Sequence, residues 1–136
     1  MNPYAIESAF KAALNASAFP TTTIYTGTSY AELTPETLNL IVVVDQLQSV
    51  GKGLYTATAN VKITMTALLG ADAESQFAAV LETLKGALTQ EYLLAHWPVT
   101  DAPNFCGSAP GTSGISTSHD GNSWTADLQL PIGVMD

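Results

Sequence analysis

Few residues in this chain have side chains suited to catalysis or metal binding, and they are scattered. There are two histidines, His96 and His119, and one cysteine, Cys106. Neither histidine has a partner at the spacing of a metal motif such as H-x-x-x-H or C-x-x-C. A single cysteine excludes an intrachain disulfide and becomes a nucleophile only with a histidine close by. We therefore interpret Cys106 as a small semi-buried residue or an incidental thiol, and we expect no metal site.

Acidic and glycine-rich segments also lack the pattern of an active site. Twelve acids lie mostly in loops and on polar helix faces, where solvation explains them. Asp45, at the end of an apolar run, is the acid that could be buried, although a solvated strand end is the favoured interpretation. Residues 51–53 are too short for a phosphate loop, and residues 111–114 do not form a nucleophile elbow. The sequence thus predicts no catalytic residues, no cofactor and no metal.

Aromatic side chains offer a weaker hint of a ligand site. Trp97 and Trp124 could form a platform for a ligand, but packing in the core is favoured, since Trp124 begins an alternating apolar series. His96 lies beside Trp97 at a helix end, where a cation suits the helix dipole. We expect His119 to be a solvent-exposed turn residue.

Length and charge limit the remaining possibilities. The 136 residues predict one domain, 1–136, that needs no disulfide or metal for stability. No apolar run approaches the ~20 residues of a membrane span, and the basic region of a signal peptide is missing at the start, so we expect synthesis in a cytoplasm. The net charge is −8, with four lysines and no arginine, which argues against tight binding to nucleic acids or anionic membranes.

The helices that would position these residues are marked by apolar spacing. A first helix begins at Asn2-Pro3 and stops before Phe19-Pro20, because the residue before proline leaves the α region. A second covers 72–88 with Asp72 as its cap, and a short third covers 91–96. Spacings of three and four residues give each main helix an apolar stripe: Ile6, Phe10, Ala13, Leu14 and Ala18 in the first, and Phe77, Val80, Leu81, Leu84 and Leu88 in the second.

The strands are marked by β-branched residues and by alternation. We predict strands over 21–26, 38–45 and 55–67, with a flexible connection over 46–53. In the strand over 55–67, apolar and polar residues alternate over ~40 Å. We therefore expect this strand to be longer than the strand over 38–45 that pairs with it. A loop over 98–114 precedes a final hairpin whose turn contains Asp120-Gly121. The order predicts an α+β fold: a mainly antiparallel sheet with a long β-hairpin and two main helices packed on one face.

Several of these features together resemble a known family. They are the first helix followed by residues 23–27, the strand over 38–44, the alternating strand over 57–67, the helix carrying Phe77, Leu81 and Leu84, and the final D-G-x-x-W hairpin with Leu128, Leu130 and Ile132. This arrangement is similar to the tail-terminator and tail-completion (neck) proteins of long-tailed bacteriophages. The resemblance covers nearly the whole chain, apart from the 98–114 loop, which has no place in the family pattern.

The resemblance implies a virion structural protein of the tail or neck. Subunits of that family form a ring, commonly a hexamer, at the head-proximal end of the tail. The ring stops growth of the tail tube and joins the tail to the head connector. DNA would pass through the ring without being bound tightly, which suits an acidic chain without arginine.

The long hairpin is the predicted assembly element. A strand that outgrows its sheet exposes hydrogen-bonding groups that a neighbour can pair with. The residues predicted to form the assembly interface are Gln46, Gln48, Ser49, Val50, Lys52, Tyr55 and Lys62. Two alternatives remain: a small binding module, such as an adhesin- or pilus-like subunit, and a small hydrolase or isomerase in which Asp45, His96 or Cys106 converge.

Overall fold

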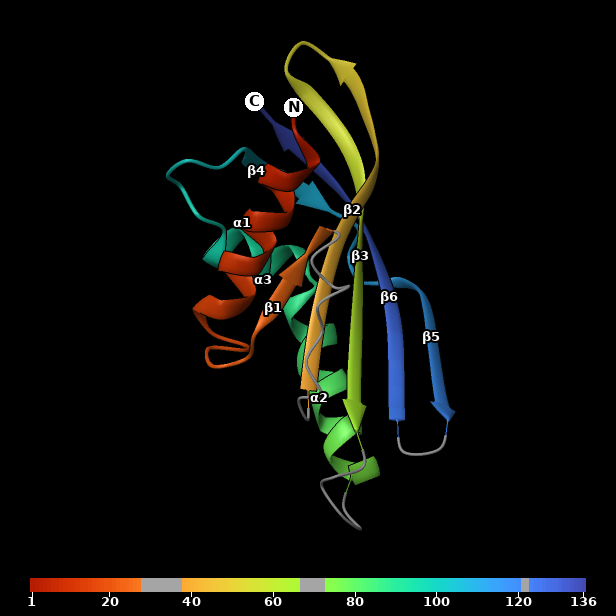
Figure 1. The fold of residues 1–136 in the computed structure, drawn as a ribbon. Helices are drawn as coiled ribbons and strands as arrows, with labels where there is room; N and C mark the ends of the chain where they lie inside the picture. The colour runs from red at the N-terminus through yellow and green to blue at the C-terminus, as the bar shows by residue number, and fades with distance from the viewer. Residues whose placement is uncertain (28–37, 67–72, 121–122) are drawn as a thin grey trace.

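A computed structural model describes residues 1–27, 38–66, 73–120 and 123–136. Over these residues the chain forms three helices and a six-stranded, mostly antiparallel sheet, so the predicted α+β class is confirmed (Figure 1). The elements in chain order are α1 (Pro3–Ala16), β1 (Ile24–Thr26), β2 (Leu38–Gly51), β3 (Leu54–Thr66), α2 (Ala73–Ala87), α3 (Gln90–His96), β4 (Asn104–Ser108), β5 (Ser113–Asp120) and β6 (Ser123–Met135).

Helix α1 begins and packs as its sequence predicts. The Asn2 side chain accepts a hydrogen bond from the Tyr4 N–H at 2.9 Å, and Pro3 occupies the first turn. The apolar stripe faces the sheet, and its fully buried members are Ile6, Phe10, Ala13 and Leu14. The ring of Phe10 also meets Trp97 edge to face at 5.1 Å, which ties α1 to the segment after α3.

Helices α2 and α3 follow each other with a cap between them. Phe77, Leu84 and Leu88 are buried, whereas Leu81 is only partly buried, so the predicted stripe is correct in part. Thr89 caps α3 by accepting from the Tyr92 N–H at 3.3 Å. The predicted cap of α2, Asp72, lies outside the described residues.

The sheet has the strand order β1-β2-β3-β6-β4, and β5 also pairs with β6. β3 pairs with β6 along its whole length, from Leu54 opposite Met135 to Thr66 opposite Ser123. β4 and β5 lie against the same side of β6, with β4 at its end and β5 at its start. One side of the sheet is therefore made of two short strands instead of one long one.

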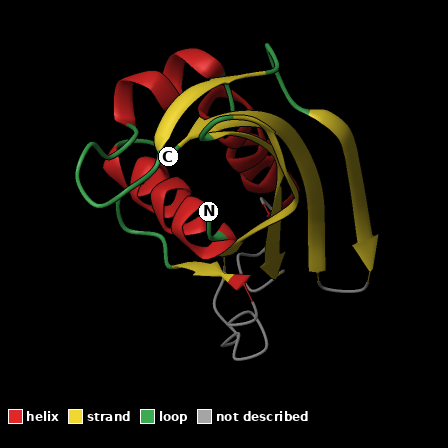
Figure 2. Ribbon diagram, turned by 90° about the horizontal axis from the view of Figure 1, so that it is seen from above, coloured by secondary structure: helices red, strands yellow, loops and turns green. Residues whose placement is uncertain are grey.

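One face of the sheet forms the core and the other is mainly polar. The register sets apolar side chains opposite one another across three strands, as in Val42, Val61 and Leu128. These residues and their neighbours two positions along are buried in one cluster with the helix stripes. Figure 2 shows the helices gathered on one side of the curved sheet, as predicted.

The structure corrects four expectations about the strands. β2 continues to Gly51, so most of the predicted connection over 46–53 is strand, and β2 and β3 have 14 and 13 residues instead of unequal lengths. The parallel pairing of β1 with β2 is consistent with the mainly antiparallel sheet that was predicted. The predicted loop over 98–114 contains β4, and His119 belongs to β5 instead of a turn. β4 exists through pairing with residues far along the chain, whereas the extension of β2 includes a bulge at Gln46 and Leu47 that breaks the local alternation.

Candidate functional site: the long hairpin and the edges of the sheet

The end of the β2–β3 hairpin, which we call the distal hairpin (residues 46–55), is shaped by a β-bulge. Asp45 pairs with Thr58 and Gln48 pairs with Thr56, so Gln46 and Leu47 together lie opposite Ala57. Gln46 has a positive φ of 54°, and its side-chain carbonyl accepts from the Thr58 hydroxyl at 3.3 Å. A bulge of this kind bends a strand and increases its twist. The distal hairpin accordingly curves at the top of the molecule in Figure 1.

The turn of the hairpin is fastened to the C-terminus of the chain. Gly53 adopts φ 70°, a conformation that glycine reaches without strain. Its carbonyl accepts a hydrogen bond from the Asp136 N–H at 2.8 Å. With β6 paired along all of β3, the hairpin is not a free arm that outgrows its sheet, and that sequence expectation is wrong.

The outer edge of β2 is covered for only part of its length. β1 pairs with Leu40, Ile41 and Val42. Beyond them the Val44 N–H donates to the Glu7 carboxylate at 2.8 Å. From Asp45 to Gly51 no strand of the described chain pairs with this edge. Within the described residues, this edge is therefore available for pairing with a partner strand.

Glu7 is a buried acid that the sequence reasoning missed. Its side chain is 2 % exposed, and its second carboxylate oxygen has no hydrogen-bond partner among the described residues. Burial raises the pKa of the Glu7 carboxyl, and the hydrogen bond from Val44 opposes this rise. The signal was its spacing, three and seven residues before Phe10 and Leu14, which places Glu7 in the apolar stripe. Beyond the residues of β2 that pair with β1, the Glu7 carboxylate is the hydrogen-bond acceptor for the Val44 N–H.

The structure brings six of the seven predicted interface residues together. Gln46, Gln48, Ser49, Val50, Lys52 and Tyr55 all belong to the distal hairpin. All are exposed except Tyr55, which is half-buried and packs against the core. Lys62 lies apart, on the polar face of β3, opposite Asp127 of β6.

Apolar side chains are exposed at the same end of the sheet. Val50 is 55 % exposed, Leu54 is 37 % exposed and Met135 is 42 % exposed. Leu54 and Met135 are direct partners in the register of β3 and β6, so they lie side by side. We call Val50, Leu54, Met135 and the neighbouring Lys52 the tip. It combines apolar surface, one cation and the free edge of β2.

The opposite side of the sheet carries a groove between α2 and β5. It measures about 430 Å³ and is lined by Glu74, Phe77, Ala78, Leu81, Thr117, Ser118, His119 and Trp124. The rings of His119 and Trp124 stack at 4.4 Å with 12° between their planes. β5 pairs with β6 alone among the described strands, so its other edge is open beside this α2–β5 groove.

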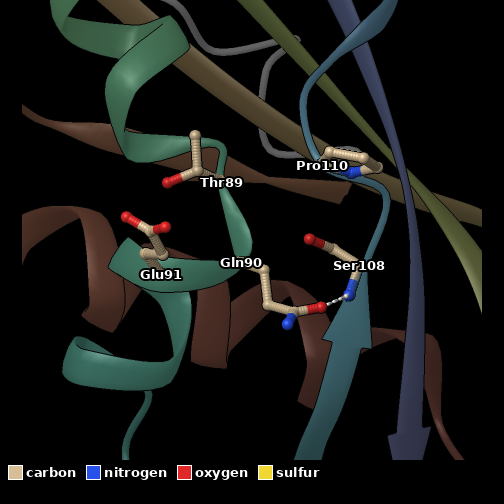
Figure 3. Close-up of a pocket in the computed structure, with 5 residues that line it drawn as sticks. All are labelled: Thr89, Gln90, Glu91, Ser108 and Pro110. Carbon is tan, nitrogen blue, oxygen red and sulfur yellow. Dashed lines mark hydrogen bonds between the residues drawn. The ribbon is translucent and has the colours of Figure 1, made fainter.

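A second hollow, of about 360 Å³, lies where α3 meets β4 (Figure 3). It is lined by Thr89, Gln90, Glu91, Ser108 and Pro110. The side-chain oxygen of Gln90 accepts from the Ser108 N–H at 3.1 Å, and this bond holds β4 against α3. Its polar groups thus serve the packing of the fold.

The three residues considered for catalysis lie on different elements. Asp45 is exposed on β2, and Cys106 is exposed on β4, its thiol 3.9 Å from the Asn104 carbonyl. His96 ends α3, where its Nδ1 lies 2.9 Å from the Tyr92 carbonyl and its ring stacks on that of Tyr92 at 4.1 Å. Among the described residues, no hydrogen bond joins any two of Asp45, His96 and Cys106. In the same part of the chain, no three His, Cys, Asp or Glu side chains lie close enough together to hold a metal ion.

The two tryptophans have different surroundings. Trp97 is 8 % exposed, and its indole N–H donates to the Pro103 carbonyl at 2.8 Å, so it belongs to the core as predicted. Trp124 is only half-buried, because its ring lines the α2–β5 groove.

Comparison with known proteins shows likeness at the level of the fold. No protein-family model matches the chain, and no curated protein matches it. One solved structure is similar with a TM-score of 0.52 at 18 % identity, and the match covers 100 % of this chain and 97 % of that chain. At this identity the likeness shows the fold alone. No helix of the described residues is long and apolar enough to cross a membrane.

Proposed function

We propose that this protein is a virion structural protein, a tail-terminator or tail-completion (neck) protein of a long-tailed bacteriophage. Its copies form a ring, a hexamer in the family it resembles, at the head-proximal end of the tail. The ring ends the tail tube and joins it to the head connector. The subunits are made in the host cytoplasm and reside in the virion. They act by assembly, without catalysis, metal or cofactor.

The observation that carries this proposal is the pair of open strand edges. The segment 45–51 of β2 is unpaired on one side of the sheet, and β5 is unpaired on the other, within the described residues. Isolated proteins usually protect such edges with lysine, proline, a β-bulge or a covering element. Neither β5 nor residues 45–51 of β2 contain lysine or proline. Each strand has one register shift, at Gln46 and Leu47 in β2 and between Ser113 and Ser116 in β5, and the rest of each edge is open within the described residues. Two different open edges suit contacts in which each subunit offers one surface and receives another, as in a ring.

The charge of the chain supports the proposed channel. The net charge is −8, with no arginine. A ring through which DNA must slide needs a surface that does not hold phosphates, and an acidic subunit repels them. We therefore expect no tight binding to nucleic acids and no membrane partner.

The test is the mass of the purified protein together with its appearance in negative-stain images. We expect a single oligomer of closed symmetry that is seen as rings in end views. A particle that stays monomeric up to high micromolar concentrations, in sedimentation velocity and in micrographs, would rule the ring out.

The α2–β5 groove favours a second candidate, a small binding module such as an adhesin- or pilus-like subunit. The groove holds an aromatic pair, His119 and Trp124, beside apolar helix residues. A binding module would be monomeric and would use this groove for a foreign ligand. Mass in solution therefore separates the two candidates.

A further inference from the structure

We propose that the tip of one copy docks into the α2–β5 groove of a second copy. This inference rests on the proposed ring and names the two surfaces that would build it. It goes beyond the hairpin itself, because it assigns the receiving surface and the residues on each side.

The groove is formed by one face of a helix and one face of a hairpin. From α2 come Glu74, Phe77, Ala78 and Leu81, which share a helix face because they are three and four positions apart. From β5 and β6 come Thr117, Ser118, His119 and Trp124. Leu81 and Trp124 are packed against the core but remain partly exposed. The groove therefore offers apolar surface that a partner could cover.

The tip supplies matching surface. Val50, Leu54 and Met135 are among the exposed large apolar side chains of the described residues. Scattered single apolar residues on a surface are ordinary, but here three gather at one end of the sheet. The free edge of β2 is beside them, and the open edge of β5 is beside the groove. Strand pairing between these edges would add main-chain hydrogen bonds to the apolar contact.

A local pairing of charges supports a second copy as the occupant. The tip carries Lys52, with Asp136 beside the same turn at Gly53, while the groove carries Glu74, and all three side chains are exposed. Two copies with net charges of −8 repel each other in general, so a contact is most favourable where one presents a cation. An exposed ion pair adds little affinity, but it favours one orientation and disfavours others.

The two surfaces are too far apart to meet within one subunit. The tip lies at the Leu54–Met135 end of the β3–β6 pairing, and the groove lies near the other end, where Trp124 is opposite Met65. Figure 1 shows these ends at the top and bottom of the molecule. A contact between unlike surfaces of successive copies produces a ring if the rotation closes and a filament if it does not.

The first experiment uses two blocking variants with matched controls. Val50→Asp places a charge on the tip, and Leu94→Asp is its control, because Leu94 is equally exposed, at 55 %, but lies on α3. Ala78→Glu obstructs the groove, and Ala79→Glu is its control, because Ala79 is exposed on α2 outside the groove. We expect each blocking variant to weaken association at least about tenfold by sedimentation, and each control to change it less than about twofold.

Mixing the two blocking variants is the sharpest readout. The Val50→Asp copy keeps an intact groove, and the Ala78→Glu copy keeps an intact tip. Each alone should be monomeric, with the thermal melt of a folded protein, and the mixture should yield dimers and nothing larger. A symmetric contact between two tips or two grooves would not give this pattern.

A charge exchange tests the orientation. Lys52→Glu and Glu74→Lys should each weaken association about fivefold, the range of an exposed ion pair, and the double variant should recover most of the loss.

The outcomes separate this inference from the proposed function. If rings of the parent persist in both blocking variants, the tip does not dock in the groove, while the ring proposal stands. If the parent forms filaments that both variants abolish, the docking is correct and the ring proposal fails. A parent that is monomeric at all concentrations contradicts both.

Discussion

Glu7 joins the first helix to the sheet through a single carboxylate. One oxygen accepts from the Val44 N–H at 2.8 Å, and the other is buried without a partner among the described residues. A buried charge of this kind is costly unless it is paired, so the neutral form is favoured in the folded protein. The raised pKa of Glu7 has this cause.

Stability should therefore depend on the protonation of Glu7. Its pKa is higher in the folded than in the unfolded chain, so its contribution is fully present below about pH 4.3, the ordinary value for glutamate, and is lost as the pH rises through the folded value. Glu7→Gln imitates the neutral acid and should remove this part of the pH dependence. Urea melts of parent and variant between pH 4 and pH 8 measure it. Parallel curves for the two proteins would contradict the prediction.

Two glycines make a matched pair for backbone effects. Gly27 has φ 58°, and an added Cβ would lie 3.1 Å from the Tyr4 ring and 3.2 Å from a Glu7 oxygen. Gly27→Ala should cost at least about 1–2 kcal/mol from the left-handed conformation alone. Gly86 is in α2 with nothing within 4 Å of its added Cβ, so Gly86→Ala should stabilise by about 0.5–1 kcal/mol. Denaturant melts that gave both variants the same sign would refute this account.

At the scale of elements, the long hairpin owes its shape to strand pairing. β6 supports β3 from end to end, and the bulge at Gln46 and Leu47 turns β2 beyond the end of β1. The result is a hairpin held firmly on one side and open on the other. An element of this kind can present an edge to a partner without having to fold first.

Helix α2 provides a test of which residues bind the helix to the sheet. Leu84 is fully buried, whereas Leu81 is partly exposed and faces the groove. Leu84→Ala should cost about 2–5 kcal/mol, as large-to-small changes in a core do. Leu81→Ala should cost clearly less because part of its surface already contacts solvent. The free energies of unfolding from urea melts would contradict this if Leu81 proved the more costly of the two.

At the scale of the whole molecule, the sheet has one mainly polar face, one face covered by helices and, within the described residues, two unlike open edges. Nothing in this arrangement brings Asp45, His96 and Cys106 together. The surfaces that remain available are suited to contact with other proteins. This arrangement supports the proposed role in assembly.

Assembly of folded subunits should raise thermal stability with concentration. A partner that binds the folded state alone stabilises it by mass action. We expect the melting temperature of the parent to rise by a few degrees over a hundredfold increase in protein concentration. Val50→Asp should melt at one temperature throughout that range. Calorimetry at several concentrations checks both, and a parent without any such rise would argue against assembly.

The sequence by itself determined the class of fold and most of the core. Spacings of three and four residues predicted the helix stripes, and alternation predicted the inward faces of β3 and β6, because these periods follow from the geometry of a single helix or strand. The start of α1 at Asn2-Pro3 was likewise predicted from neighbouring residues alone. The β2–β3 hairpin was also predicted, but most of the flexible connection expected over 46–53 is strand.

Tertiary structure alone decided which backbone groups are paired and which are left open. The extension of β2 to Gly51 is interrupted by a bulge that shifts the alternation, so the local pattern breaks where the strand continues. β4 is five residues long and exists through its pairing with β6. The burial of Glu7 and the α2–β5 groove arise from residues far apart in the chain. Such pairings depend on the arrangement of whole elements, and no short stretch of sequence contains that information.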